Sequence, residues 1–155
     1  MVYLERVHAG FSRLGVDVRI GTRLPAYYTA MGQAVLAFLP SKKVHEVLDS
    51  CKRVKITPDT PTTIAEIESR LEFVREIGFA VADPKVIIGL RVLAAPILDA
   101  DGQSQAAISV VAPSVNITLE EFVERTTEPV VKAAVDIGKA MQISGVAPAE
   151  TISAV

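Results

Sequence analysis

The part of the sequence best suited to holding a small molecule is the stretch GTRLPAYYTAMG at residues 21–32. It reads as a glycine turn, a crossing stiffened by Pro25, and the start of a helix near Thr29. The first amides of a helix have no partner within the helix and attract anions. Small side chains from Ala30 to Gly32 would let this backbone approach a carboxylate. An ordinary strand-to-helix connection explains the same pattern, so the residues alone leave both interpretations open.

Arginine side chains supply the candidate partners for an acid, because a guanidinium pairs with a carboxylate through two hydrogen bonds. The best candidates are Arg19, Arg23 and Arg91. Arg19 alternates with Val18 and Ile20, so we expect it to face away from the core. The alternative for Arg23 and Arg91 is a structural role, in which they tie loops together through backbone carbonyls.

The sequence contains no pattern typical of catalysis or metal binding. A GxSxG motif is absent, and Cys51 lies beside Lys52 and Arg53 with no histidine nearby. One cysteine and two histidines form neither an internal disulfide nor a structural zinc cluster. We therefore expect a protein that is not an enzyme and has no metal or cofactor.

Composition narrows the class of protein further. The 155 residues include 16 basic and 18 acidic side chains, so the net charge is −2 and lacks the basic surplus of a nucleic-acid-binding domain. Half of the residues are hydrophobic and 22% are charged, which excludes disorder as the default state. No window resembles a signal peptide or a membrane-spanning helix. We expect a cytoplasmic protein with no membrane partner.

Hydrophobic periodicity predicts strands and helices in a mixed order. The predicted strands are 2–7, 16–20, 79–82, 92–98 and 106–112. Helices are expected after Thr29, Ser41, Thr63 and Thr118, with Ser41 as a cap and with capping boxes that pair Thr63 with Glu66 and Thr118 with Glu121. The order predicts an α+β domain with a largely antiparallel sheet flanked by helices. The last helix should bury one stripe and bend at Pro129; the stripe consists of Leu119, Phe122, Val130, Ala134, Ile137 and Met141.

The stretch at 21–32 closely resembles the effector-binding domain of IclR-family bacterial transcription regulators, which commonly read GxRLPxxxxxG before an apolar helix. A second block agrees in order and spacing: REIGFAV at 75–81, GLR at 89–91, AAPI at 94–97, DG at 101–102 and AAISV at 106–110. The resemblance runs from about Val2 to Ala140. It looks nearest to the subgroup that senses acids of aromatic catabolism such as protocatechuate.

This resemblance implies a GAF-like sensor domain that binds a small organic acid and forms a homodimer or homotetramer. The acid would shift the conformation or the oligomer that controls an attached DNA-binding domain. Members of the family carry a winged helix-turn-helix ahead of the sensor. We therefore expect residues 1–143 to be an N-terminally truncated effector-binding domain and residues 144–155 a loose tail, with DNA bound only through a domain missing from this chain.

Carried over position by position, the ligand pocket of the family falls on residues from both blocks. They are Val16, Ala30, Met31, Gly32, Asp83, Leu90, Val92 and Ser109. The resemblance implies that Ser109 donates its hydroxyl to a carboxylate oxygen and that the apolar members form a wall. Simple core packing is the alternative for each apolar member.

Two departures from the family pattern bear on the ligand. Acidic residues usual after the strand at 79–81 are replaced by Ala82, Pro84 and Lys85, so that only Asp83 remains. Val111 stands where the family has a second serine. These changes leave the identity of the effector open, and they favour a second hypothesis: an oligomerisation module whose pocket is degenerate.

Overall fold

The computed structural model describes residues 1–2, 4–5, 7, 20–82 and 89–144. The elements in chain order are α1 (Ala30–Leu36), α2 (Ser41–Asp49), α3 (Ile64–Ile77), β1 (Ala80–Ala82), β2 (Leu90–Leu98), β3 (Ser104–Pro113) and α4 (Leu119–Ser144). The predicted α+β class is confirmed. Of the predicted strand 2–7, the described residues contribute only one isolated bridge, from Val2 to Arg23. The predicted strand 16–20 lies outside the described residues except Ile20, and the tail lies outside them except Ser144.

The three strands form an antiparallel sheet in the order β1-β2-β3, so β2 is central. Residue pairs across the ladders include Ala82 with Val92 and Ala94 with Ser109. From Val92 to Ile97 every residue of β2 is buried, which confirms the prediction from its continuous apolar run. Both long strands extend beyond the predicted bounds, because the ladder continues to Leu90 opposite Pro113.

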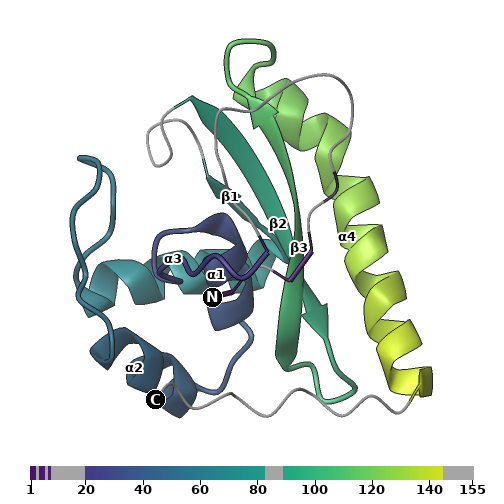
Figure 1. Cartoon of the computed structure of the whole chain (residues 1–155), viewed down its shortest axis with the longest axis horizontal. Coiled ribbons are helices and arrows are strands. Elements are labelled where there is room, and N and C mark those ends of the chain that lie inside the picture. Colours follow the sequence, from purple (N-terminus) through teal and green to yellow (C-terminus); the bar gives the residue numbers. More distant parts are fainter. Residues whose placement is uncertain (3, 6, 8–19, 83–88, 145–155) are drawn as a thin grey trace.

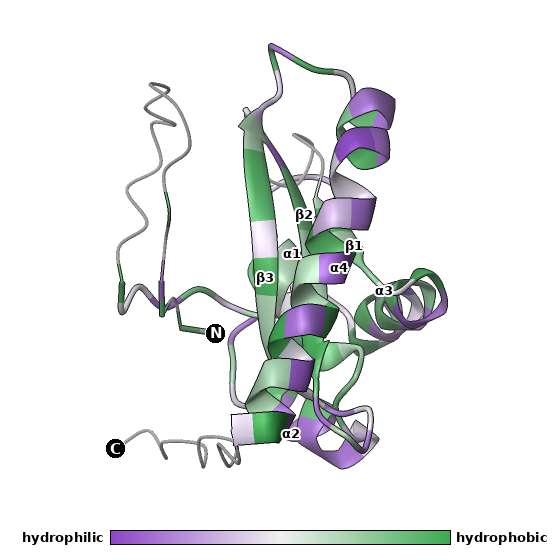
Figure 2. Cartoon of the chain, turned by 90° about the vertical axis from the view of Figure 1, so that its right-hand side faces the viewer, coloured by the Kyte–Doolittle hydropathy of each residue, from purple (hydrophilic) through white to green (hydrophobic). Residues whose placement is uncertain are grey.

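Helices cover both faces of the sheet (Figure 1): α1, α2 and α3 lie on one side and α4 on the other. Successive side chains of a strand point to opposite faces. Val92 and Ala94 accordingly belong to the core with α1, α2 and α3, whereas Ala95 and Ile97 pack with α4. Figure 2 colours the chain by hydropathy and shows β2 and β3 largely green, whereas α4 carries both purple and green positions.

The helix starts follow the predicted capping with one exception. Thr63 and Glu66 form a reciprocal capping box at α3, and Thr118 and Glu121 exchange two hydrogen bonds of 3.2 Å at α4. Ser41 does not cap α2, so this expectation is wrong. It is the first residue inside the helix, and its hydroxyl lies 3.4 Å from Nδ1 of His45 one turn later.

The predicted stripe of α4 is mostly correct. Phe122 and Ala134 are buried, but Ile137 is exposed. Gly138 is the buried residue in that turn, because a Cβ there would lie 2.7 Å from the carbonyl oxygen of Leu98. The close approach of α4 to the end of β2 therefore depends on a glycine at 138.

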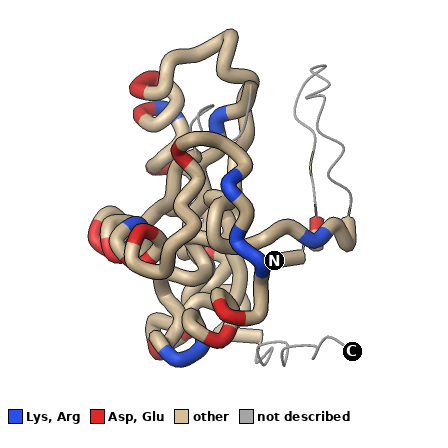
Figure 3. The backbone as a smooth tube through the Cα atoms, turned by 90° about the vertical axis from the view of Figure 1, so that its left-hand side faces the viewer, with Lys and Arg blue, Asp and Glu red and all other residues tan. Residues whose placement is uncertain are grey.

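The surface shows no single dominant charge. Acidic and basic positions are interspersed over the helices and loops in the view of Figure 3. Over the described ranges, no group of three or more His, Cys, Asp or Glu side chains is arranged to hold a metal ion. A separate search of the same residues finds no helix whose length and apolar character would suit a membrane span.

Candidate functional site

The crossing from Pro25 to Thr29 is held in place by its own hydrogen bonds. Thr29 is the N-cap of α1: its hydroxyl accepts from the amide of Gly32 and donates to the carbonyl of Pro25, both over 3.2 Å. The side-chain amide of Gln33 donates to the carbonyl of Tyr27 over 3.1 Å. The start of α1 and the chain leading into it therefore form one rigid corner.

Gly32 has a different role from the one that the sequence suggested. Its amide already donates to Thr29, and a Cβ added at Gly32 would lie 2.2 Å from the carbonyl oxygen of Ala26. The backbone that approaches residue 32 closely is therefore that of the preceding turn. The amide of Gly32 is therefore not free to bind a ligand. Glycine is required at this position because a larger side chain would clash with Ala26.

Tyr27 anchors the same corner to a distant segment, a role that sequence reasoning missed. Its side chain is 1% exposed, and its hydroxyl donates to the carbonyl of Val54 over 2.8 Å and accepts from the amide of Val54 over 2.9 Å. The ring of Tyr28 packs against it edge-on at 5.2 Å between centroids. The threonine just before an apolar helical run signals the cap at Thr29, but no local pattern indicates the partner of Tyr27.

The pocket residues that were predicted on β2 and β3, and that the structure describes, lie on the side of the sheet that faces α1. Leu90 and Val92 lie on this side of β2, and Ser109 lies opposite Ala94 on β3, so all three share one face. Ala30 and Val92 are buried in one core cluster against which Met31 packs. Ser109 is half-buried at the margin of this cluster. Val16 and Asp83 lie outside the described residues.

The arrangement is an apolar sheet face with a single hydroxyl near its outer strand. Leu90, Val92 and Ala30 are all buried, which also fits their alternative role in core packing. Val111, opposite Val92 on the same face, is 36% exposed and adds apolar surface instead of a second hydroxyl. Chemically, this face suits the apolar part of a small molecule that presents one hydrogen-bond acceptor.

Arg91 has a structural role, which the sequence analysis left open as the alternative to binding an acid. It lies between Leu90 and Val92, so it faces the α4 side and not the side of Ser109. Its Nη1 donates to the carbonyls of Ser114 (2.6 Å) and Ile117, which fastens the loop between β3 and α4. Its buried Nε has no hydrogen-bond partner among the residues that the structure describes.

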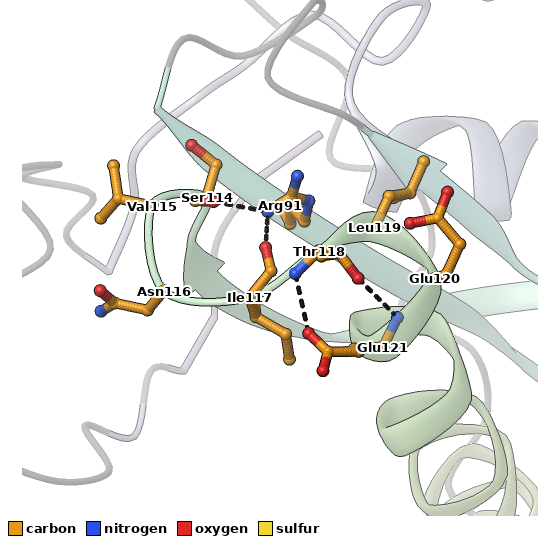
Figure 4. A pocket seen from close by; sticks show the side chains of 9 residues that line it. All are labelled: Arg91, Ser114, Val115, Asn116, Ile117, Thr118, Leu119, Glu120 and Glu121. Atoms are coloured by element: carbon orange, nitrogen blue, oxygen red, sulfur yellow. Dashed lines mark hydrogen bonds between the residues drawn. The ribbon is translucent and has the colours of Figure 1, made fainter.

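This loop and the start of α4 line a hollow of about 560 Å³, whose lining residues are drawn in Figure 4. The residues lining it are Arg91, Ser114, Val115, Asn116, Ile117, Thr118, Leu119, Glu120 and Glu121. The single arginine is engaged with two carbonyls, and Glu120 and Glu121 bring negative charge. The hollow therefore does not suit an acid.

Arg23 is the remaining candidate for pairing with an acid. It is exposed, and its backbone bridges to Val2. Its guanidinium makes no side-chain hydrogen bond with another described residue, and it lowers the pKa of the Met1 amino group, for which burial is the larger cause. The structure thus places Ala30, Met31 and Val92 at one core cluster. Leu90 and Ser109 share the sheet face of Val92 but lie four positions apart along the ladder, and Arg91 is on the opposite face.

Comparison with known proteins gives a consistent assignment. The family described as bacterial transcriptional regulator IclR C-terminal matches residues 1–139. The Pca regulon regulatory protein of Pseudomonas putida is 32% identical over 128 residues, which cover 81% of this chain and 43% of that protein. The chain thus spans less than half the length of this relative. The matched relatives are transcription regulators and not enzymes, in agreement with the sequence.

Solved structures agree with the fold. The crystal structure of Thermotoga maritima IclR is 28% identical with a TM-score of 0.82, covering 91% of this chain and 56% of that one. The inducer-binding domain of the PobR transcription factor from Acinetobacter, a double mutant in complex with 3-hydroxybenzoic acid, has a TM-score of 0.67 at 21% identity. It is matched over 87% of this chain and 74% of its own, and it supports the fold alone. The chain therefore belongs to the IclR family of bacterial transcription regulators, and it forms the C-terminal effector-binding domain of that family.

Proposed function

We propose that this domain senses a small organic acid, of the aromatic class, that binds on the α1-facing side of the sheet beside Ser109. The single observation that carries the proposal is the placement of the Ser109 hydroxyl on the same face as Leu90 and Val92, next to the cluster that contains Ala30 and Met31. An aromatic ring suits the apolar surface, and the hydroxyl suits a carboxylate oxygen. The PobR domain, which shares the fold, was solved with such an acid.

The corner at α1 offers a way for binding to be transmitted. A ligand changes a conformational equilibrium only if it binds one state better than the other. Thr29, Gly32 and Ala26 hold the start of α1 rigidly, and Tyr27 links it to Val54. A ligand that displaces Met31 would therefore move this corner as one body, together with the segment around Val54. In the proposed regulator, a DNA-binding domain outside this chain responds to that shift.

The proposal is tested by calorimetric titration with 3-hydroxybenzoate, protocatechuate and a short keto acid, alongside thermal unfolding. We expect saturable heat and a raised Tm for an aromatic acid. S109A should weaken binding about 10- to 150-fold, because a hydrogen bond to a charged group contributes about 1.5–3 kcal/mol. S50A is the matched control, because the Ser50 hydroxyl donates to the carbonyl of Val47 at the end of α2.

Two results would refute the sensing proposal. One is the absence of heat and of any Tm change with every acid at millimolar concentration. The other is equal affinity in S109A and S50A, which would place the acid elsewhere. R91M should bind as the wild type does, because Arg91 faces the other side of the sheet.

A second candidate function is an oligomerisation module with a degenerate pocket. Three observations favour it: the Gly32 amide is already bonded, Arg91 is engaged with loop carbonyls, and Val111 supplies no hydroxyl. A stable oligomer in light scattering that is unaffected by every acid in the panel would support this function over sensing.

A further inference from the structure

The loop between α2 and α3 is held rigidly, although it projects from the body of the domain at the left of Figure 1. Arg53 donates from Nε to the carbonyl of Thr62 over 2.9 Å and from Nη1 to the carbonyl of Leu48, so its side chain ties the end of α2 to the start of α3. Near the tip, the hydroxyl of Thr60 accepts from the amide of Thr57 over 2.9 Å, and both threonines are buried. The loop therefore has one defined shape.

The first arm of this loop, residues 52–56, is extended at its centre. Tyr27 donates its hydroxyl to the carbonyl of Val54 over 2.8 Å and accepts from the amide of the same residue over 2.9 Å. Both groups of one residue reach a single atom when they point to the same side, as they do in a β-strand. The peptide groups of the neighbours, Arg53 and Lys55, then point the opposite way, and no hydrogen bond reaches them from the part of the chain that the structure describes. The Tyr27 hydroxyl thus occupies one edge of the arm and leaves the other edge open.

The side chains of this arm form an apolar and basic surface. Val54 is 51% exposed and Ile56 is 52% exposed, and the alternation of an extended chain places both on one face. Lys52 and Lys55 are exposed beside them. From position 50 to position 58 the sequence has no acidic residue. Figure 3, which looks onto this side of the molecule, shows blue along the loop.

We propose that the arm at 52–56 is a docking site for an extended, acidic segment of another protein, which pairs as a β-strand with the open peptide groups of Arg53 and Lys55. Strand addition takes its affinity from main-chain hydrogen bonds and its specificity from alternate side chains. Apolar residues of the partner pack against Val54 and Ile56, and its acidic residues face the two exposed lysines. A rigid loop loses little conformational entropy on binding. The proposal concerns the loop and not the acid site, so either can fail without the other.

Charge selects an acidic partner over the alternatives. A second copy of the arm would bring lysine against lysine, and like charges directly opposite one another destabilise a strand pair. A nucleic acid would meet aliphatic side chains here, whereas single strands are bound by stacking on aromatic rings and by many phosphate contacts. The pKa of the Glu66 carboxyl is lowered chiefly by the amides of Thr63 and Thr62 and least by Lys55, so this lysine remains available to a partner.

A short peptide of alternating glutamate and valine, acetylated and amidated at its ends, is a suitable probe because an extended chain places its valines on one face and its glutamates on the other. We expect saturable binding to the whole chain in fluorescence anisotropy, and slower hydrogen exchange at the amides of Arg53 and Lys55 in the bound state. A peptide of alternating lysine and valine should bind about 10-fold more weakly or less. The glutamate peptide with N-methyl groups at alternate residues should also bind at least about 10-fold more weakly, because it cannot pair as a strand.

Charge reversal tests the two lysines. K52E/K55E should weaken binding of the glutamate peptide by about 10-fold or more and strengthen binding of the lysine peptide. K42E/K43E is the matched control: it changes the net charge equally, and both lysines are exposed at the start of α2. This control should bind the glutamate peptide as the wild type does at physiological salt, where charges outside the arm are screened.

Removal of the apolar side chains gives a second, independent test. V54S/I56S should weaken the glutamate peptide by about 10-fold or more, whereas V115S should not, although Val115 is 86% exposed in the loop after β3. The proposal is overturned if the glutamate peptide fails to bind at millimolar concentration or if its N-methylated form binds equally well. Equal affinities in K52E/K55E and K42E/K43E would overturn it too. An oligonucleotide that displaces the peptide and binds more tightly would identify a nucleic acid as the occupant instead.

Discussion

Replacement of Gly32 by alanine separates the two explanations for this glycine. If the residue were small to let α1 amides approach a ligand, G32A would leave folding intact or improve it, because alanine is favoured over glycine in a helix by about 1 kcal/mol. It would lower only the affinity for the acid. The structure instead places Ala26 against this position, so the same substitution should destabilise the fold without any ligand present.

The expected loss follows from the geometry. The new Cβ would lie 2.2, 2.4 and 2.7 Å from the oxygen, Cα and carbonyl carbon of Ala26, all backbone atoms that cannot rotate away. To reach ordinary contact distances the start of α1 must move by about 1 Å, which also strains the bond from Gly32 to Thr29. Overpacking of this kind costs about 1–3 kcal/mol, and a lost cap about 1 kcal/mol more. After the gain in helix propensity the net loss is about 2 kcal/mol.

Thermal and urea unfolding measure this loss. For a chain of this size, about 2 kcal/mol lowers the Tm by roughly 4–8 °C. G102A is the control: its added methyl meets no atom within 4 Å, so only the cost of its positive φ of 74° remains, about 1 kcal/mol. A G32A variant as stable as the wild type, or more stable, would refute the packing argument and restore the ligand explanation.

Three further substitutions test other contacts. R91M should cost about 1–3 kcal/mol in urea unfolding and speed hydrogen exchange in the loop at 114–118, because two carbonyls lose their donor; unchanged exchange there would contradict the role of Arg91. G138A should lower stability by about 1–2 kcal/mol, since its Cβ would lie 2.7 Å from the oxygen of Leu98, and an unchanged Tm would show that α4 moves freely. Backbone amides of Thr63 and Thr62 hold the pKa of the Glu66 carboxyl below its ordinary value. The charged carboxylate therefore stabilises the fold fully at pH values above the ordinary pKa, and this stabilisation is lost as the pH falls through the lowered pKa. E66Q should accordingly lose less stability than the wild type between about pH 5 and pH 3, and identical acid unfolding of the two proteins would contradict this.

The elements that sequence predicted well are those fixed by local chemistry. The capping boxes at Thr63 and Thr118 need only residues three apart, and the buried run of β2 is a property of composition. The sharing of one face by Leu90, Val92 and Ser109 follows once the hairpin register is known. The family resemblance named these positions as pocket residues, and that role stays a prediction.

Contacts between distant segments could not be predicted in the same way. Arg91 finds its acceptors 23 and 26 residues later, and Tyr27 finds Val54 27 residues away. Gly32 is required because the chain doubles back on Ala26, which no propensity encodes. Ser41 failed as a cap because Pro40 extends the helix start by one residue, leaving the serine inside it. For Arg91 and Tyr27 the partner was set by tertiary packing, whereas Gly32 and Ser41 depend on the local path of the chain.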